Sequence, residues 1–299
     1  MMAVVTHSYL FASTGRNGKR HGRDSILGRV GTITVLIVTA AITIFPFLVC
    51  LLTSFAPIKD VNSWPPKFIP SSFTLSNYNE LFQRVPVGRQ FLNSLIFASA
   101  VTLSSLILDA LAAYALSRLD FRGRNTLLFV LIASMMVPYQ ALLIPLYKMM
   151  AATGIIEASS MIAMILPRLA DVAGIFLLRQ FFVSLPRDLD NAARIDGAGE
   201  FRVFWSIILP NAKQGLFTLA LFNFMNNWND LLWPLIMTNK TKDRTLIAGL
   251  SMLNGSVGGA VPYGVMMAGS VIAVIPLVII FAFVQRQFVE GIAMTGMKG

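Results

Sequence analysis

Two long stretches without a charged side chain most constrain how this chain can fold. Residues 30–58 and 245–285 contain no Asp, Glu, Lys or Arg, which gives uncharged runs of 29 and 41 residues. A helix needs about 20 apolar residues to cross a bilayer core of roughly 30 Å. Of the whole chain, 56% of residues are hydrophobic and 13% are charged, whereas soluble domains carry about 25% charged residues. The sequence therefore predicts an integral membrane protein.

Six apolar segments are long enough to cross a membrane. Helix is expected for each, because a helix pairs its own backbone polar groups within lipid. We expect an all-α protein in which residues 28–299 form one six-helix transmembrane domain, preceded by a polar tail over residues 1–27. The first segment is too long for the apolar core of a signal peptide, so we expect it to remain as a span. The predicted spans are residues 28–55, 90–117, 126–150, 159–182, 215–237 and 263–284.

The net charge of +10 follows from the expected topology. Most of the 24 lysines and arginines lie in segments on the same side of the membrane as the N-terminus. The positive-inside rule places that side, and both termini, in the cytoplasm. A pI of 10.1 would suggest nucleic-acid binding in a soluble protein, but here the location of the charges argues against it.

Metal and disulfide chemistry is excluded by the positions of the few residues that support it. His7 and His21 lie in the N-terminal tail, and Cys50, the single cysteine, lies inside the first predicted span. A zinc site of the Cys/His type or an intrachain disulfide is therefore not expected. We predict no metal site and no catalytic residue.

Residues 185–210 have the pattern of two short helices on the cytoplasmic side. Pro186 suits the first turn of a helix, and Asp188 and Asp190 follow where the helix dipole favours acidic side chains. Gly197 is the expected stop, because glycine readily adopts the left-handed conformation of a helix cap. A second helix then ends at Pro210 and carries an apolar face formed by Phe201, Phe204, Trp205 and Ile208. An exposed apolar element of this kind is typical of a docking surface.

This segment resembles the EAA coupling loop of binding-protein-dependent ABC importer permeases. Its residues are similar to those of the carbohydrate branch, in particular to the smaller membrane subunit of maltose-type systems. Further similarity lies at residues 113–118, 227–235 and 296–299, so the resemblance runs from about residue 28 to the C-terminus. Asn191 stands where the motif has Glu, with Asp190 directly before it. The matching residues are Ala192-Ala193, Gly197, Ile207 and Leu209-Pro210.

The resemblance implies a type I ABC importer permease fold within a larger complex in the bacterial inner membrane. In such a complex two permease subunits form the pore, and two ATPase subunits, which bind ATP and Mg²⁺, each grip one coupling helix. An external binding protein delivers a sugar. The coupling segment would span residues 183–213, with a cytoplasmic tail over residues 286–299. The implied ATPase-coupling residues are Asn191, Ala192, Ala193, Asp196, Gly197, Phe201, Phe204, Ile207, Leu209 and Pro210.

The sequence agrees with ATP hydrolysis by another chain. A phosphate-binding P-loop requires two glycines at a fixed spacing, followed by Lys and then Ser or Thr. In this chain the one Gly-Lys pair is Gly18-Lys19, with Ser13 at the position of the first glycine and Arg20 at that of Ser/Thr. We therefore expect a non-catalytic subunit that binds no cofactor of its own.

Polar side chains within the predicted spans form a second group. Ionisable residues are costly in lipid and usually face a bundle interior or a water-filled cavity. Arg168 and Asp171 are three residues apart on one helical face, so we expect a local structural ion pair, with a role in lining the pathway as the alternative. The group comprises Asp109, Arg168, Asp171, Asn223, Asn226, Asn227, Asn229 and Asp230.

The fifth predicted span combines these asparagines with two tryptophans. Amide groups and aromatic faces suit the hydroxyls and C–H faces of a sugar, but asparagine serves equally well to join transmembrane helices. Both interpretations stay open. The candidate pathway or gate residues are Asn226, Asn227, Trp228, Asp230, Trp233, Arg168 and Asp171.

Two segments are expected on the outer side of the membrane. Residues 57–89 are rich in proline and aromatic residues, which is typical of a stiff loop at the membrane interface. Residues 239–262 are polar and rich in glycine, which permits close approach to a partner. Together with the resemblance, this predicts contact with the binding protein, for which Asn254 and Gly255 are the candidate residues.

Three other functions are weighed against the importer. A self-sufficient channel or proton-coupled carrier would use Asp109, Arg168, Asp171 and Asp230, but it calls for ion relays or inverted repeats, and the sequence shows no repeat. The same importer machinery can carry a non-sugar solute such as a phosphodiester or a peptide. An intramembrane enzyme is disfavoured, because the predicted spans contain no histidine and no carboxylates paired at a useful spacing.

Overall fold

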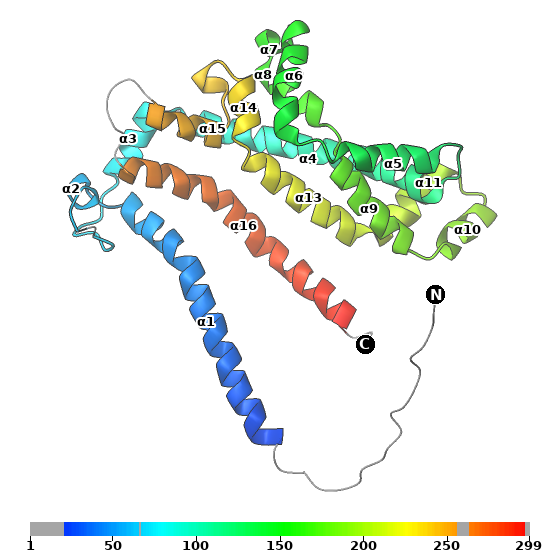
Figure 1. Cartoon of the computed structure of the whole chain (residues 1–299), viewed down its shortest axis with the longest axis horizontal. Coiled ribbons are helices and arrows are strands. Elements are labelled where there is room, and N and C mark those ends of the chain that lie inside the picture. The colour runs from blue at the N-terminus through cyan, green and yellow to red at the C-terminus, as the bar shows by residue number, and fades with distance from the viewer. Residues whose placement is uncertain (1–20, 66, 256–262, 297–299) are drawn as a thin grey trace, which may run out of the picture. The chain divides into compact units, whose positions relative to one another are not determined.

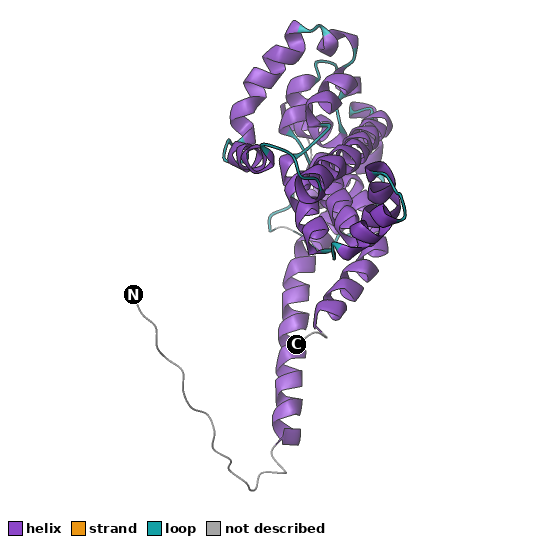
Figure 2. Ribbon diagram, turned by 90° about the vertical axis from the view of Figure 1, so that its right-hand side faces the viewer, coloured by secondary structure: helices purple, strands orange, loops and turns teal. Residues whose placement is uncertain are grey.

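The computed structural model describes the backbone of residues 21–65, 67–255 and 263–296, and the side chains of residues 28–65, 67–253 and 263–284. Helices joined by loops make up these parts, and the described residues contain no strand (Figure 2). The longer elements in chain order are α1 (His21–Ser54), α3 (Ser76–Arg84), α4 (Val87–Arg118), α5 (Arg124–Ser134), α6 (Tyr139–Ala152), α9 (Val172–Ser184), α10 (Asp188–Ile195), α13 (Lys213–Trp228) and α16 (Tyr263–Gly296). Between them lie the shorter elements α2 (Ile58–Val61), α7 (Ile155–Ala158), α8 (Ser160–Ile165), η1 (Leu166–Arg168), α11 (Glu200–Val203), η2 (Phe204–Ile208), α12 (Leu209–Asn211), α14 (Leu232–Met237), η3 (Thr241–Asp243), α15 (Leu246–Ser251) and η4 (Met252–Gly255).

The chain divides into two units, Met1–Val49 and Cys50–Gly299. The boundary falls within α1. In the first unit, the described part of α1 exposes apolar side chains such as Val35 and Ile42, which are 65% and 69% accessible. A helix with such a surface satisfies its own backbone groups and is suited to lipid.

Three described helical segments are long and apolar enough to cross a membrane: Gly28–Ser54, Val87–Arg118 and Tyr263–Val284. They coincide with the spans predicted at residues 28–55, 90–117 and 263–284. The last of them belongs to α16, which continues to Gly296 and so extends over most of the expected C-terminal tail.

The other three predicted spans are interrupted, so the expectation of a continuous helix was wrong for residues 126–150, 159–182 and 215–237. α5 meets α6 at 98°, and the α8–η1 segment meets α9 at 42°. α13 ends at Trp228, and α14 begins at Leu232. If each bent pair counts as one span, the described residues hold five candidate spans.

Local chemistry explains the three breaks. Pro138 precedes the first residue of α6, and the residue before a proline is disfavoured in the helical region. Asp171 is the N-cap of α9, where its side chain accepts a hydrogen bond from the backbone N–H of Ala173. Asp230 accepts one in the same way from Trp233 at the start of α14. Short polar side chains at these positions favour a new helix start over continuation.

α4, α9 and α13 pack against one another and form the centre of the second unit (Figure 1). α4 has 32 residues, which corresponds to a length of about 48 Å. The start of α4 contacts η3 and α15, and its end contacts the segment that contains α10. The two surfaces described below therefore lie at opposite ends of one long helix.

Three groups of buried apolar side chains include residues of α4, and two of them bear on the sites described below. The Leu178 cluster surrounds the second half of α4 and comprises Ala110, Ala113, Tyr114, Leu116, Ile175, Leu178, Phe182, Ala193, Val203, Phe204, Ile208, Ala212 and Leu219. The Met164 cluster surrounds its first half and comprises Phe97, Val101, Leu143, Met150, Ile156, Ala163, Met164, Trp233 and Met237.

Candidate functional site

The turn between α10 and α11 is built on Gly197. This residue has φ = +78°, as predicted for a helix stop in the left-handed region. The Gly197 N–H donates to the carbonyl of Arg194 at 3.0 Å, and the Ala198 N–H donates to that of Ala193 at 2.9 Å. These two bonds form a Schellman motif, which satisfies the last carbonyls of a helix and reverses the chain. The turn fixes the angle between α10 and the segment that follows.

One face of this coupling segment, residues 183–213, is buried in the chain itself. Ala193, Val203, Phe204 and Ile208 belong to the Leu178 cluster and are between 0% and 8% exposed. Ala193 and Phe204 were expected to contact an ATPase, yet both point into the core. Their contribution is to seat the segment on α4 and α9. Ile207 and Leu209 are partly buried against the same cluster.

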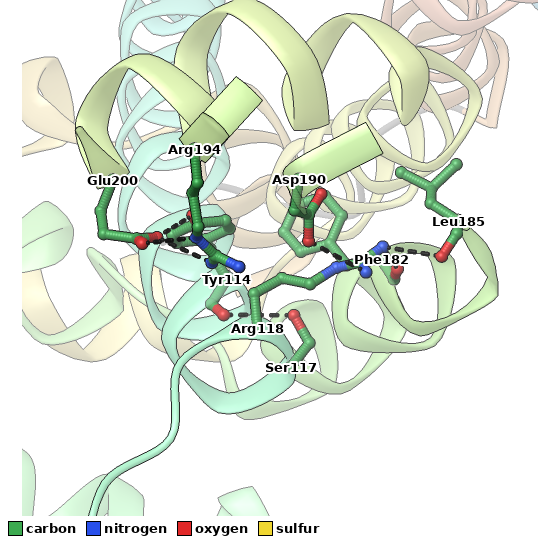
Figure 3. A network of polar contacts seen from close by, with 8 residues as sticks. All are labelled: Tyr114, Ser117, Arg118, Phe182, Leu185, Asp190, Arg194 and Glu200. Atoms are coloured by element: carbon green, nitrogen blue, oxygen red, sulfur yellow. Dashed lines mark hydrogen bonds and ion pairs between the residues drawn. The ribbon is translucent and has the colours of Figure 1, made fainter. Parts of the chain in front are cut away.

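A buried ion pair anchors the start of the segment to the end of α4 (Figure 3). Arg118 Nη1 lies 3.1 Å from Asp190 Oδ2, and both side chains are almost fully buried. Nη2 of the same guanidinium donates to the carbonyls of Phe182 and Leu185, which end α9. One arginine thus joins α4, α9 and α10. Separating Arg118 from Asp190 would leave a buried charge without its partner, which is strongly unfavourable. The ion pair therefore fixes the orientation of α10.

Glu200, at the start of α11, closes the turn from the other side (Figure 3). Arg194 Nε donates to Glu200 Oε1 at 2.9 Å, and the Tyr114 hydroxyl donates to Oε2 at 2.5 Å. The hydrogen bonds from Arg194 and then Tyr114 hold the pKa of the Glu200 carboxyl below its usual value. The hydrogen bond between Arg194 and Glu200 also raises the pKa of the Arg194 guanidinium. The two arms of the turn are therefore tied to each other and to α4.

The opposite face of the segment is exposed and carries large apolar side chains among polar ones. Asn191, Ala192, Asp196, Gly197, Phe201 and Pro210 are exposed, as a docking surface requires. Two strongly exposed apolar residues, Ile195 at 86% and Trp205 at 54%, were absent from the predicted contact set. Trp205 was already part of the predicted aromatic face, and this could have placed it in the set. An apolar surface of this kind marks a protein interaction site.

A second polar site lies inside the helical bundle, around Arg168. Its guanidinium pairs with Asp230, with 2.5 Å between Nη2 and Oδ2, and donates from Nη1 to Asn227 Oδ1 at 2.9 Å. The predicted local pair with Asp171 was wrong, because the helix ends at Arg168 and the three residues that follow do not continue it. Asp171 is exposed instead and caps α9. Its backbone N–H donates to Asp109 at 2.9 Å.

The tryptophans of this region are packing residues. Trp228 is 1% exposed and Trp233 is 0% exposed. The Trp228 indole N–H donates to the carbonyl of Ala273, and that of Trp233 donates to the carbonyl of Met164. Both ring faces are therefore covered by protein, which favours helix packing over sugar stacking. Asn227 is buried as well, whereas Asn226 in α13 and Asn229, directly after it, are exposed.

A polar hollow lies near the start of α4. It has a volume of about 460 Å³ and is lined in part by Arg89, Glu157, Lys240, Lys242 and Asp243. The segment that contains η3 is fastened to α4 beside it. Lys240 and Lys242 are exposed and have no carboxylate partner among the described residues.

Four hydrogen bonds between α4 and residues 241–246 hold the η3 segment in place. Gln90 donates to the carbonyl of Thr241, and Asn93 donates to those of Lys242 and Arg244, at 2.9–3.0 Å. Ser94 accepts from the backbone N–H of Leu246 at 2.7 Å. The predicted contact residues Asn254 and Gly255 follow in η4, and residues 256–262 of that loop lie outside the described residues.

Comparison with known proteins identifies relatives of this chain. Residues 105–293 match the family described as "Binding-protein-dependent transport system inner membrane component". The arabinooligosaccharides transport system permease protein AraQ of Halalkalibacterium halodurans is 34% identical over 263 residues, which cover 87% of this chain and 93% of the relative. The sn-glycerol-3-phosphate transport system permease protein UgpE of Yersinia pestis is 30% identical over 264 residues, which cover 86% of this chain and 93% of that protein.

A solved structure shares the fold. A chain from the crystal structure of a bacterial ABC transporter involved in the import of the acidic polysaccharide alginate aligns with a TM-score of 0.75. The alignment covers 91% of this chain and 99% of that chain, with 22% sequence identity. The two chains therefore share their fold.

Proposed function

Because this chain belongs to the family of binding-protein-dependent transport system inner membrane components, we propose that it forms half of the translocation pore of an ATP-driven sugar importer. Members of this family are non-catalytic permease subunits of ABC transporters in the inner membrane. In the proposed complex a second permease subunit completes the pore, and two ATPase subunits bind ATP and Mg²⁺. An external binding protein delivers the solute.

The names of the relatives support a sugar as the solute. One related permease serves arabinooligosaccharides, and the transporter with the same fold imports alginate. Asn226 in α13 and Asn229 directly after it are exposed and offer amide groups to hydroxyl groups; polar side chains of this kind are costly in lipid. We place them with the exposed Asp171 on the pathway. A phosphorylated polyol is the second candidate, favoured by the sn-glycerol-3-phosphate relative.

The proposed topology has six spans, with both termini on the ATPase side. α13 and α14 together would form the fifth span, and residues 28–299 the transmembrane domain. The distribution of lysine and arginine supports this orientation. A further support is that the coupling segment and the η3 segment contact opposite ends of α4, a helix of about 48 Å, which exceeds the thickness of a bilayer core.

The observation that carries the coupling proposal is the two-sided build of residues 183–213. One side is buried and anchored through Asp190 and Glu200. The other side presents Ala192, Ile195, Phe201 and Trp205. A rigidly held element with exposed apolar side chains can bind an ATPase and transmit its movement to α4 and α9, on which the segment packs. Asn191 can still donate and accept hydrogen bonds there, although it lacks the charge of the Glu in the EAA motif.

The coupling proposal is tested by Gly197→Val. At φ = +78° a residue with a side chain pays about 1–2 kcal/mol for the left-handed conformation, and valine tolerates it poorly. The altered turn should misplace the exposed face. In proteoliposomes with the ATPases, the second permease and the binding protein, ATPase stimulation and uptake of an arabinooligosaccharide should both fall roughly fivefold or more.

Gly199→Val is the matched control. Gly199 lies two residues further on with φ = −73° and ψ = 162°, an extended conformation that valine accepts, and a Cβ there meets no atom within 4 Å. This variant should keep stimulation and uptake. Full retention of both activities by Gly197→Val would refute the coupling assignment.

The binding protein is proposed to dock at the opposite end of α4. The candidate residues Asn254 and Gly255 belong to the same chain segment as η3, which α4 holds in place through Gln90, Asn93 and Ser94. Exposed Lys240 and Lys242 give this surface a positive charge that suits an acidic partner. A fixed backbone lowers the cost of ordering the surface on binding.

A further inference from the structure

The three broken spans have their breaks at one place in the bundle. Tyr139 is the first residue after the break between α5 and α6, and Arg168 is the last residue before the break between η1 and α9. Asp230 lies in the break between α13 and α14. These residues are far apart in sequence, yet the side chain of Arg168 contacts both of the others.

Every nitrogen of the Arg168 guanidinium has a partner from one of these spans. Nε donates to the Tyr139 hydroxyl at 3.2 Å, Nη1 donates to Asn227 at 2.9 Å, and Nη2 pairs with Asp230 at 2.5 Å. The guanidinium carbon also lies 4.8–5.9 Å from the ring centroids of Tyr139, Trp233 and Phe97. Such a site satisfies a charge at membrane depth that would otherwise be very costly.

Hydrogen bonds continue from this site back to the break in the fourth span. Asn227 donates to Asn223 at 2.6 Å, and Asn223 donates to Ser105 on α4 at 2.9 Å. Ser105 in turn donates to Asp109. Asp109 accepts from the backbone N–H of Asp171, three residues after Arg168. The break between η1 and α9 is thus bonded to α13 on one side and to α4 on the other.

The breaks also separate the two apolar clusters. In the fourth and fifth spans, α9 and α13 contribute to the Leu178 cluster, whereas α8 and α14 contribute to the Met164 cluster. In the third span, α6 contributes to the Met164 cluster, and Leu128 and Leu131 of α5 pack, partly buried, against the Leu178 cluster. The Leu178 cluster contains the buried face of the coupling segment. α4 passes through both clusters without a break. Arg168 lies at the breaks, where the third, fourth and fifth spans pass from one cluster to the other.

We propose that Arg168 is a positioning residue for coupled transport, which locks the helices on the two sides of these breaks together. The proposal rests on the function proposed above. When the coupling segment is displaced, α9 and α13 move first. Arg168 transmits this movement to α6 and α14, so the Met164 cluster moves together with the Leu178 cluster. Without Arg168, α4 is the continuous connection and the breaks act as hinges, because helix ends absorb changes in backbone angles.

The test measures the distance across the breaks directly. Spin labels are placed at two exposed positions, Ile144 in α6 and Val183 in α9, after Cys50→Ser removes the native cysteine. The complex is reconstituted with its ATPases, the second permease and the binding protein, and distances are recorded with and without ATP plus vanadate. We expect one narrow distribution in both nucleotide states for the parent complex. We expect a broadened or shifted distribution in the Arg168→Gln, Asp230→Asn double variant.

The double variant is chosen so that the protein still folds. Replacing Arg168 alone would leave the Asp230 carboxylate, which is 15% exposed, without its counter-charge. Asn at position 230 keeps an oxygen that can cap α14, and Gln keeps polar contact with Asn227. Arg168→Lys retains the charge but not the planar fork, so it should restore part of the parental behaviour. Arg84→Gln, which breaks an exposed pair with Glu80, is the control and should change nothing.

Stimulation of ATP hydrolysis by the binding protein, per assembled complex, is the second readout. We expect this stimulation to fall roughly fivefold or more in the double variant, while basal ATP hydrolysis persists. A parental distance distribution in the double variant, or a distance in the parent that changes with nucleotide, would overturn the lock. A parent complex with no stimulation at all would instead contradict the proposed function, so the two failures are distinguishable.

Discussion

At the scale of single residues, Glu200 shows how charge orders the coupling segment. Its carboxylate receives hydrogen bonds from Arg194 in α10 and from Tyr114 in α4, so it joins three elements at the turn. The side chain is about half exposed, and solvent screens its ion pair with Arg194 to at most about 1 kcal/mol. The contribution is therefore local order of the turn rather than global stability.

The pH dependence of this order follows from the lowered pKa of Glu200. A carboxyl whose folded pKa lies below its usual 4.5 contributes stability that is present above that value and is lost as the pH falls through the folded pKa. We predict that hydrogen-exchange protection of residues 188–203, corrected for intrinsic rates, is constant near neutrality and falls at acidic pH. Glu200→Gln should lower protection already at pH 7 and remove the acid step. An unchanged acid step in that variant would assign it to another carboxyl.

At the scale of elements, the contact between α9 and α4 depends on a missing side chain. A Cβ on Gly174 would contact the Asp109 carboxylate and would lie 3.0 Å from Leu219 Cδ1. The site is buried where α4, α9 and α13 meet, so the neighbours have little room to move. Small residues at such crossings are what allow transmembrane helices to approach closely.

We predict that Gly174→Ala destabilises the second unit by about 1–3 kcal/mol, the usual cost of overpacking. The measurement is thermal unfolding of the purified permease complex in detergent. Gly88→Ala provides the comparison, since a Cβ at that position in the first turn of α4 meets no atom within 4 Å and alanine favours the helix. Equal melting temperatures for the two variants would show that the crossing has room to relax.

The sequence predicts correctly those helices whose residues are apolar and uncharged over most of their length. Residues 30–58 and 263–284 are uncharged throughout, and the stop at Gly197 follows from a property of glycine alone. Hydropathy carries no information on direction, so residues 126–150 remain apolar through the 98° bend. Pro138 and Asp171 were the local signals of a break.

Contacts between distant residues had no such signal. Arg168 and Asp230 lie in different spans, and Asp171, the nearest acid in sequence, was the natural partner on a continuous helix. The pair of Arg118 with Asp190 likewise depends on how α10 folds back onto α4. In the same way, the pattern of the coupling segment predicted an apolar face, but the division into buried Phe204 and exposed Phe201 required the packed structure.

At the scale of the whole importer, α4 connects the two surfaces that we propose for the ATPase and for the binding protein. Its end holds the coupling segment through Arg118, and its start holds the η3 segment through Asn93. A helix of this length is a stiff connection between the two membrane faces. In the proposed complex, the binding protein at one end and the ATPase at the other would act on the same helix, which is what reciprocal coupling between two sites requires.

The charge of the η3 surface gives the prediction for the binding protein. Lys240 and Lys242 are exposed beside a hollow of about 460 Å³, and charges at the rim of an interface act mainly on association and on its salt dependence. We predict that Lys240→Glu combined with Lys242→Glu raises the KM for the binding protein in ATPase assays by roughly tenfold at low salt. The effect should shrink as added salt shortens the screening length.

Lys59→Glu reverses the charge of another exposed lysine, in α2, and should leave that KM near the parental value. Basal ATP hydrolysis should be equal in all three proteins, because none of these lysines contacts the coupling segment. An unaltered KM in the double variant at low salt would move the docking surface away from η3. A rise that persists at high salt would mean that the substitutions disturb the fold of the η3 segment instead of its charge.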